Sequence, residues 1–221
     1  PPYDGTGGWS VDPTTQTAGV SFVATVRGTD NWYNLVGSAG GMVTIVTSDP
    51  YDTHPSPAAL NFGIRTFNIT MYQSSTQTVT ATTGEPGVSA GVSQKVYIRP
   101  NVINRVQILA PGEVYAAGNV GGRGRLSTPS ARTAGDPFDV TVNACDAHYN
   151  IVSSNPLCTV ATTDPWDTEP SARQLVNGTT TFNLTLVTAR VSSATVSAPG
   201  LSGDYTGNIT VNPNSTYKLQ V

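Results

Sequence analysis

The sequence repeats itself once, and this repeat constrains the fold more than any other feature. Residues 22–26 (FVATV) return as residues 138–142 (FDVTV), at an offset of 116 residues. Residues 66–70 (TFNIT) return as residues 181–185 (TFNLT), at an offset of 115. Small changes in the offset indicate insertions and deletions in loops, because the spacing within each apolar run is unchanged. The chain therefore consists of two copies of one module.

Length and composition fit two domains of a strand-rich extracellular protein. Half of the 221 residues is about 110, a common size for a domain with its own core. Only 11% of the residues are charged, whereas Gly (22) and Pro (16) are plentiful, as is typical of turn-rich secreted proteins. The net charge of −3 argues against a nucleic acid partner. No apolar run approaches the roughly 20 residues of a membrane span, so none is expected.

Apolar residues alternate with polar ones along most of the chain. In residues 138–144, Phe138, Val140 and Val142 fall on one face, which predicts a half-buried strand. Similar strands are expected at residues 42–47, 66–71, 76–82, 94–99, 157–162, 181–186, 194–198 and 208–212. No helical stripe is evident. About seven strands per module predict an all-β fold with two tandem immunoglobulin-like β-sandwich domains.

Turn motifs in both copies resemble those of a known family. Residues 146–152 (DAHYNIV) resemble the Asp-x-x-Gly-Asn-x-Val turn of bacterial Ig-like surface repeats, found in invasin- and intimin-like adhesins and surface fibres, and residues 30–36 (DNWYNLV) repeat the pattern. Tyr33 and Tyr149 stand where that family usually has Gly. The resemblance implies an Ig-like fold and an extracellular, cell-surface location, but no particular chemistry. Asp suits such turns because its carboxylate accepts backbone N–H groups.

A Pro-Asn break occurs at residues 100–101 and again at residues 213–214. After the first break, Val106 and Ile108 share one face of a strand that is expected to open the second domain. We therefore expect Ig-like domain 1 over residues 1–102, Ig-like domain 2 over residues 103–213, and a C-terminal strand over residues 214–221.

The C-terminal strand is predicted to join one copy of the chain to another. Pro1 corresponds to Pro111, so domain 1 is expected to lack its opening strand, which would expose unpaired backbone groups and an apolar groove. Tyr217, Leu219 and Val221 share one face and are predicted to fill that groove in a neighbouring copy. Such a contact propagates into a head-to-tail homopolymer, an extracellular fibre or pilus-like filament.

Two other functions remain open. In the first, the chain is part of a longer tandem array and acts as a spacer in a larger cell-surface protein. In the second, it is an adhesin or carbohydrate-binding module whose partners are host or surface glycans, with exposed aromatic residues at turns as the binding platform. The same aromatic residues could instead cover the ends of the sandwiches.

Cys145 and Cys158 occur only in the second copy. In a chain of this composition we expect an extracellular disulfide between them, and two buried thiols are the alternative. Five sequons offer possible glycosylation sites, at Asn68, Asn177, Asn183, Asn208 and Asn214.

Candidates for chemistry are few. The two histidines are not matched between the copies, and no nucleophile with a base is evident, so neither enzymatic activity nor a cofactor is expected. Carboxylates recur at matching turns and could supply oxygen ligands to calcium, or could simply build the turns. They are Asp49, Asp52, Asp164, Asp167 and Glu169. We favour turn building and assign no metal site.

Overall fold

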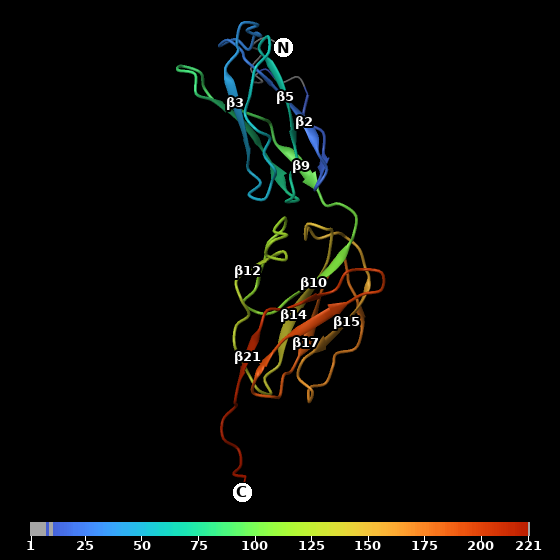
Figure 1. Ribbon diagram of the computed structural model, residues 1–221. Coiled ribbons are helices and arrows are strands. Elements are labelled where there is room, and N and C mark those ends of the chain that lie inside the picture. The colour runs from blue at the N-terminus through green and yellow to red at the C-terminus, as the bar shows by residue number, and fades with distance from the viewer. Residues whose placement is uncertain (1–7, 9–10, 221) are drawn as a thin grey trace. The chain divides into compact units, whose positions relative to one another are not determined.

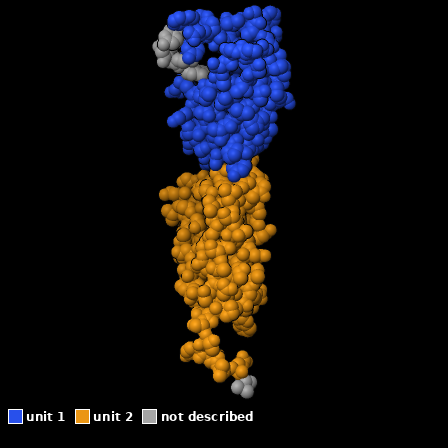
Figure 2. Space-filling model, turned by 90° about the vertical axis from the view of Figure 1, so that its left-hand side faces the viewer, with its two compact units in different colours: residues 1–100 blue, residues 101–221 orange. Residues whose placement is uncertain are grey.

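The computed structural model describes residue 8 and residues 11–220. The chain divides into two compact units, residues 1–100 and 101–221, coloured separately in Figure 2. This division falls two residues before the boundary that the sequence indicates. All regular structure in the described residues is β, and they contain no helix that could span a membrane.

Unit 2 is a β-sandwich of three small sheets and a hairpin (Figure 1). The first sheet contains, in order, β10 (Arg105–Leu109), β14 (Phe138–Cys145) and β17 (Thr179–Leu184). The second contains β16 (Arg173–Gln174), β15 (Leu157–Thr162), β19 (Ala194–Ser197) and β20 (Asp204–Tyr205). The third contains β13 (Arg132–Thr133), β21 (Ile209–Asn212) and β18 (Val191–Ser192). The hairpin pairs β11 (Val114–Tyr115) with β12 (Arg125–Leu126).

The core of unit 2 lies between the first two sheets. Alternate residues of β14 point into it, and Phe138, Val140 and Val142 are at most 5% exposed. They pack with Phe182 of β17 and Val160 of β15, which come from opposite sheets. The period-two pattern of the sequence thus produces a closed apolar interior.

Among the described residues, unit 1 repeats this architecture without counterparts of β10 and of the β11–β12 hairpin. Its first sheet contains only β2 (Phe22–Arg27) and β5 (Ile64–Ile69), the counterparts of β14 and β17. The second contains β4 (Ala58–Ala59), β3 (Met42–Thr47), β7 (Val79–Thr83) and β8 (Gly91–Val92). The third contains β1 (Gln16–Thr17), β9 (Val96–Arg99) and β6 (Thr76–Gln77). The prediction of an all-β, Ig-like fold is confirmed in both units.

The turn motif adopts the same conformation in each unit. Asp30 Oδ1 accepts backbone hydrogen bonds from Trp32 and Asn34, both at 2.9 Å. Asp146 Oδ1 plays the same part in unit 2. Tyr33 and Tyr149 both have φ of 63°, a left-handed conformation that non-glycine residues seldom adopt. The Asp carboxylate therefore fixes a tight turn at the end of β2 and of β14.

Candidate functional site

The main difference between the two units lies at the outer edge of the first sheet. In unit 2, β10 pairs antiparallel with β14 along five residues, from Arg105 opposite Cys145 to Leu109 opposite Thr141 (Figure 1). In unit 1, the described residues contain no strand paired with the corresponding edge of β2, which pairs with β5 alone. We call this edge of β2 the open edge. A sheet edge of this kind presents N–H and C=O groups to any strand of suitable sequence.

The core-facing side chains of β2 and β14 also differ in how deeply they are buried. Phe22, Ala24 and Val26 of β2 are only partly buried, although they face the core of unit 1. Their counterparts in β14 are almost inaccessible, because β10 covers that side of the sandwich with the fully buried Val106 and Ile108. The open edge therefore leads directly to accessible core surface.

Besides β14, the residues around Ser202 form a second wall of the site that β10 occupies. In unit 2, the amide of Val106 donates to the carbonyl of Ser202 at 2.9 Å, and the amide of Ser202 donates to the carbonyl of Asn104 at 3.1 Å. The offset of 113 residues maps Ser202 onto Ser89 and the partly buried Leu201 onto Val88. Ser89 is exposed, and Val88 is 58% exposed. By this correspondence, Ser89 and Val88 are the residues expected to form the second wall in unit 1.

The residues predicted to form the polymer interface are in open surroundings. Tyr217 is 96% exposed and Leu219 is 90% exposed, and residues 213–220 form no strand. Val221 lies outside the described residues. The equivalent residues Val106 and Ile108 are in β10 with no exposed surface, at the position that the repeat predicts. Docking of the C-terminal strand onto a neighbouring copy stays a prediction.

A buried ionic cluster, which the sequence analysis missed, anchors the β11–β12 hairpin to β20. Asp204 pairs with both Arg123 and Arg125, and Arg125 also pairs with Glu113 at 3.0 Å. Asp204 also accepts the backbone amide of Ile108 at 3.2 Å, so the cluster holds β10 in place. Asp204 is 7% exposed and Arg125 is 8% exposed. At the position of Asp204, unit 1 has Gly91, which has no carboxylate.

The expected disulfide is not present, because Cys145 points away from the core on the first sheet whereas Cys158 points into the core from the second sheet. Cys145 and Cys158 are free and buried. On β14 the core-facing positions are even-numbered, ending at Ala144, so Cys145 lies on the outer face. Cys158 of β15 belongs to the core itself. Burial raises the pKa of the Cys145 thiol, with a further contribution from Asp146, and burial raises the pKa of Cys158 to about 11.

The recurring carboxylates act as hydrogen-bond acceptors for loops. Asp164 accepts the backbone amides of Val187 at 2.7 Å and Thr188 at 2.8 Å, and Asp49 does the same for Tyr72 and Gln73. Asp52 and Asp167 each accept a threonine hydroxyl, and Glu169 accepts the amide of Thr162. Among the described residues, no three His, Cys, Asp or Glu side chains gather as a metal site would require. These contacts support turn building as their role.

The hydrogen bonds of Asp164 give unit 2 a stability that depends on pH. Burial alone would raise the pKa of Asp164, but the hydrogen bonds from Thr188, Trp166 and Val187 outweigh it and lower the pKa to about 2, from a usual 3.8. As the pH falls, the Asp164 carboxylate is therefore protonated at a higher pH in the unfolded chain than in the folded unit. The stabilisation is complete above about pH 4 and is lost as the pH falls towards 2.

We expect Asp164→Asn to reduce the free energy of unfolding of unit 2 by about 1–3 kcal/mol at neutral pH, because an amide accepts fewer of these bonds. The difference between the wild type and the variant should shrink as the pH falls from about 4 towards 2. Urea unfolding of both chains across this range measures it. A difference that does not change with pH would show that the carboxylate charge is not what stabilises these loops.

All five sequon asparagines are exposed. Two of their amides already donate hydrogen bonds, from Asn183 to Asp139 and from Asn214 to the carbonyl of Ala134. Glycan occupancy stays a prediction. Among the aromatic residues at turns, Trp166 is 78% exposed whereas Tyr149 is 5% exposed, so the described structure gathers no common platform within unit 2.

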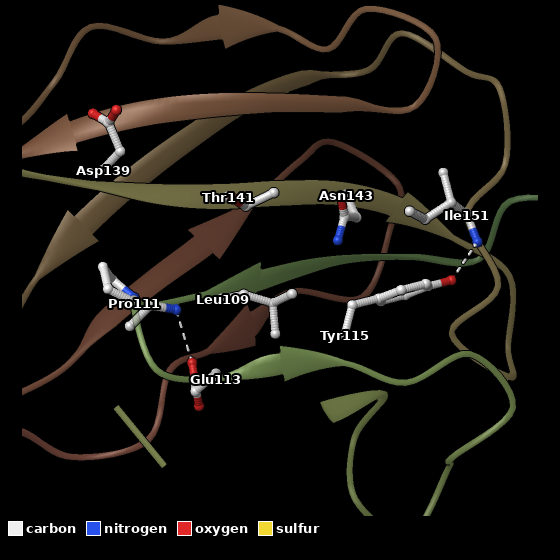
Figure 3. A pocket seen from close by; sticks show the side chains of 9 residues that line it. Leu109, Pro111, Glu113, Tyr115, Asp139, Thr141, Asn143 and Ile151 are labelled. Carbon is white, nitrogen blue, oxygen red and sulfur yellow. Dashed lines mark hydrogen bonds between the residues drawn. The ribbon is translucent and has the colours of Figure 1, made fainter. Parts of the chain in front are cut away.

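Unit 2 also has a shallow pocket of about 370 Å³ on the outer face of β10 and β14 (Figure 3). Leu109 and Ile151 line it together with Thr141 and Asn143 of β14. Its polar groups already have partners: Glu113 accepts the amide of Ala110 at 2.8 Å, and the Tyr115 hydroxyl accepts that of Ile151 at 3.1 Å. None of the residues predicted from the sequence as site residues lines this pocket.

Several solved structures are similar to this chain. The D0–D1 domain of intimin is 15% identical, with 91% of this chain and 95% of that chain covered and a TM-score of 0.34. Invasin, a bacterial integrin-binding protein, is 15% identical, with 91% and 38% covered and a TM-score of 0.35. Domains 4 and 5 of the S-layer protein SbsC are 14% identical, with 84% and 79% covered and a TM-score of 0.34.

At such low identity the likeness concerns the fold alone. The chain spans less than two thirds of the invasin structure. No protein-family model and no curated protein matches the sequence.

Proposed function

We propose that the protein is a structural, non-enzymatic subunit of an extracellular fibre or pilus-like filament at the cell surface. In this filament, the C-terminal strand of one copy fills the open edge of unit 1 in the next copy. The observation that carries the proposal is that β2 lacks, among the described residues, the partner that β10 provides to β14. Among the described residues, this edge of the sheet is therefore paired in unit 2 and unpaired in unit 1.

The sequence of the C-terminal segment identifies it as the occupant. Residues 217–221 (YKLQV) correspond to residues 104–108 (NRVQI) at the offset that relates the two Pro-Asn breaks. The residue after each break makes the same local turn, since Asn101 Oδ1 accepts the amide of Val102 at 2.8 Å and Asn214 Oδ1 accepts that of Ser215 at 2.7 Å. The two breaks therefore share one local hydrogen bond.

The surface location is supported by features of this chain itself. Its low content of charged residues, the turn motifs of bacterial Ig-like surface repeats and five exposed sequon asparagines all suit an extracellular protein. Binding of host or surface glycans, as an adhesin would require, is the second candidate function, and the exposed Trp166 is the observation that favours it. The fibre is the better supported of the two functions.

Intact mass and electron microscopy of the native material test the proposal together. We expect filaments that fall apart, after denaturation without reduction, into separate subunits that each carry the two modules once. A covalent polypeptide many modules long would instead identify the chain as a spacer within a larger surface protein, and would contradict assembly by strand donation between separate subunits.

A further inference from the structure

We propose that three polar contacts, in addition to the apolar face, fix the register of the donated strand on the open edge. In this register Asn214 binds at Asp30, Lys218 lies over Tyr33, and Gln220 binds at Gly8. The inference rests on the proposed function and extends it to the residues that determine specificity. Each contact has a counterpart that unit 2 makes with its own β10.

The first contact involves the turn at the end of β14. The backbone amide of Asn101 donates to Asp146 Oδ2 at 2.9 Å, just before β10 begins. Asp30 has the same local bonds as Asp146, including one from the side-chain amide of Asn34 to Oδ2 at 3.0 Å. Because Asn214 corresponds to Asn101, its backbone amide is placed to donate to Asp30 in the next copy.

The second contact is between a cation and an aromatic ring. The guanidinium of Arg105 lies 4.5 Å from the centre of the Tyr149 ring. Tyr33 has the same backbone conformation as Tyr149, and Lys218 corresponds to Arg105. An ammonium group over the face of a tyrosine ring is attractive in the same way as a guanidinium.

The third contact depends on a glycine that packs against the tyrosine. Gln107 donates to the carbonyl of Gly124 at 2.8 Å, and a Cβ on Gly124 would collide with both Tyr149 and this amide. Gly8 corresponds to Gly124, has φ of 79°, and likewise leaves no room for a Cβ against its tyrosine, Tyr33. Gln220, the counterpart of Gln107, is thereby directed to the carbonyl of Gly8.

These polar contacts are needed because the apolar pattern alone does not select a register. A slip of two residues leaves the same face of the strand towards the core, since side chains alternate with a period of two. Such a slip would remove all three polar contacts together. By analogy with the pairing of Gln107 with Asn143, the proposed register places Gln220 opposite Arg27 on β2.

Disulfide trapping in the full chain tests this register. We expect the double variant Arg27→Cys/Gln220→Cys to form, on mild oxidation, a ladder of cross-linked oligomers that reduction removes. The matched pairs Thr25→Cys/Gln220→Cys and Thr29→Cys/Gln220→Cys report slips of two residues in either direction. They should cross-link about tenfold less, because a diagonal pair lies roughly 7–8 Å apart between Cα atoms, beyond easy disulfide reach.

All three partner positions on the β2 side are exposed on the outer face, so the substitutions leave the core intact. The native thiols of Cys145 and Cys158 are buried and are the same in all three variants, so any cross-linking through them does not affect the comparison. If one of the slipped pairs gives the stronger ladder, the proposed register is wrong, although strand donation stands. If electron microscopy shows filaments for all three variants and none cross-links, strand donation at the open edge fails as well.

Discussion

A chain that lacks residues 215–221 is expected to remain monomeric at concentrations at which the complete chain forms filaments, while unit 2 stays folded. The deletion removes Tyr217, Leu219 and Val221, and the burial of each is worth about 1.5–3 kcal/mol. It also removes the backbone hydrogen bonds of the new strand pair. Sedimentation velocity and electron microscopy measure the loss of assembly, and circular dichroism confirms that the fold is retained.

A pair of single substitutions serves as the control for the deletion. Leu219 corresponds to Val106, which is fully buried in unit 2. Leu219→Asp places a charge at this position and should prevent assembly almost as completely as the deletion. Ser215→Asp adds the same charge at the counterpart of Val102, which is 77% exposed, and should leave assembly unchanged. Filaments formed by the truncated chain, or by Leu219→Asp, would contradict the proposed interface.

Replacing Asp204 by Ala is expected to destabilise unit 2 by about 3–5 kcal/mol, because Arg123 would lose its carboxylate partner and the buried Arg125 would keep only Glu113. The backbone amide of Ile108 would also lose its acceptor. Amide hydrogen exchange of β10 measures the effect directly, since we expect these amides to become much less protected.

Asp139→Ala is the matched control. Asp139 is exposed on the outer face of β14 and makes one side-chain hydrogen bond, to Asn183, so its loss should cost less than about 1 kcal/mol. Equal effects of the two substitutions would show that the buried cluster does not hold β10 in place.

Most of the fold could be predicted because short-range sequence patterns determine it. Period-two alternation located β5, β14 and β17, and the internal repeat gave the number of units. The Asp-Asn turns were predictable from side-chain chemistry, and the structure shows the hydrogen bonds that this chemistry requires. Val106 and Ile108 were correctly assigned to a strand of unit 2.

The cysteines show what spacing alone cannot give. Cys145 and Cys158 are close in sequence, and this proximity suggested a disulfide. The alternation along β14 already argued against this disulfide, because Ala144 faces the core and its neighbour Cys145 must therefore face outward. Side-chain direction is the better guide within strands.

The ionic cluster could not have been predicted in the same way. Asp204 and Arg123 are 81 residues apart, and the segment that contains Arg123 is rich in Gly, with no periodic pattern to place it. The pairing depends on how the β11–β12 hairpin folds back onto β20. Such long-range contacts follow from tertiary structure, although Gly91 at the position of Asp204 indicates that the two units differ there.

The most direct test of strand donation is a high-resolution electron cryomicroscopy structure of the native filament. We predict a strand paired along β2 of each subunit, antiparallel to it, whose density continues into residues 213–216 of the neighbouring subunit. Strand donation would be contradicted by a strand at β2 that belongs to the same subunit, or by filaments in which no strand pairs with the edge of β2.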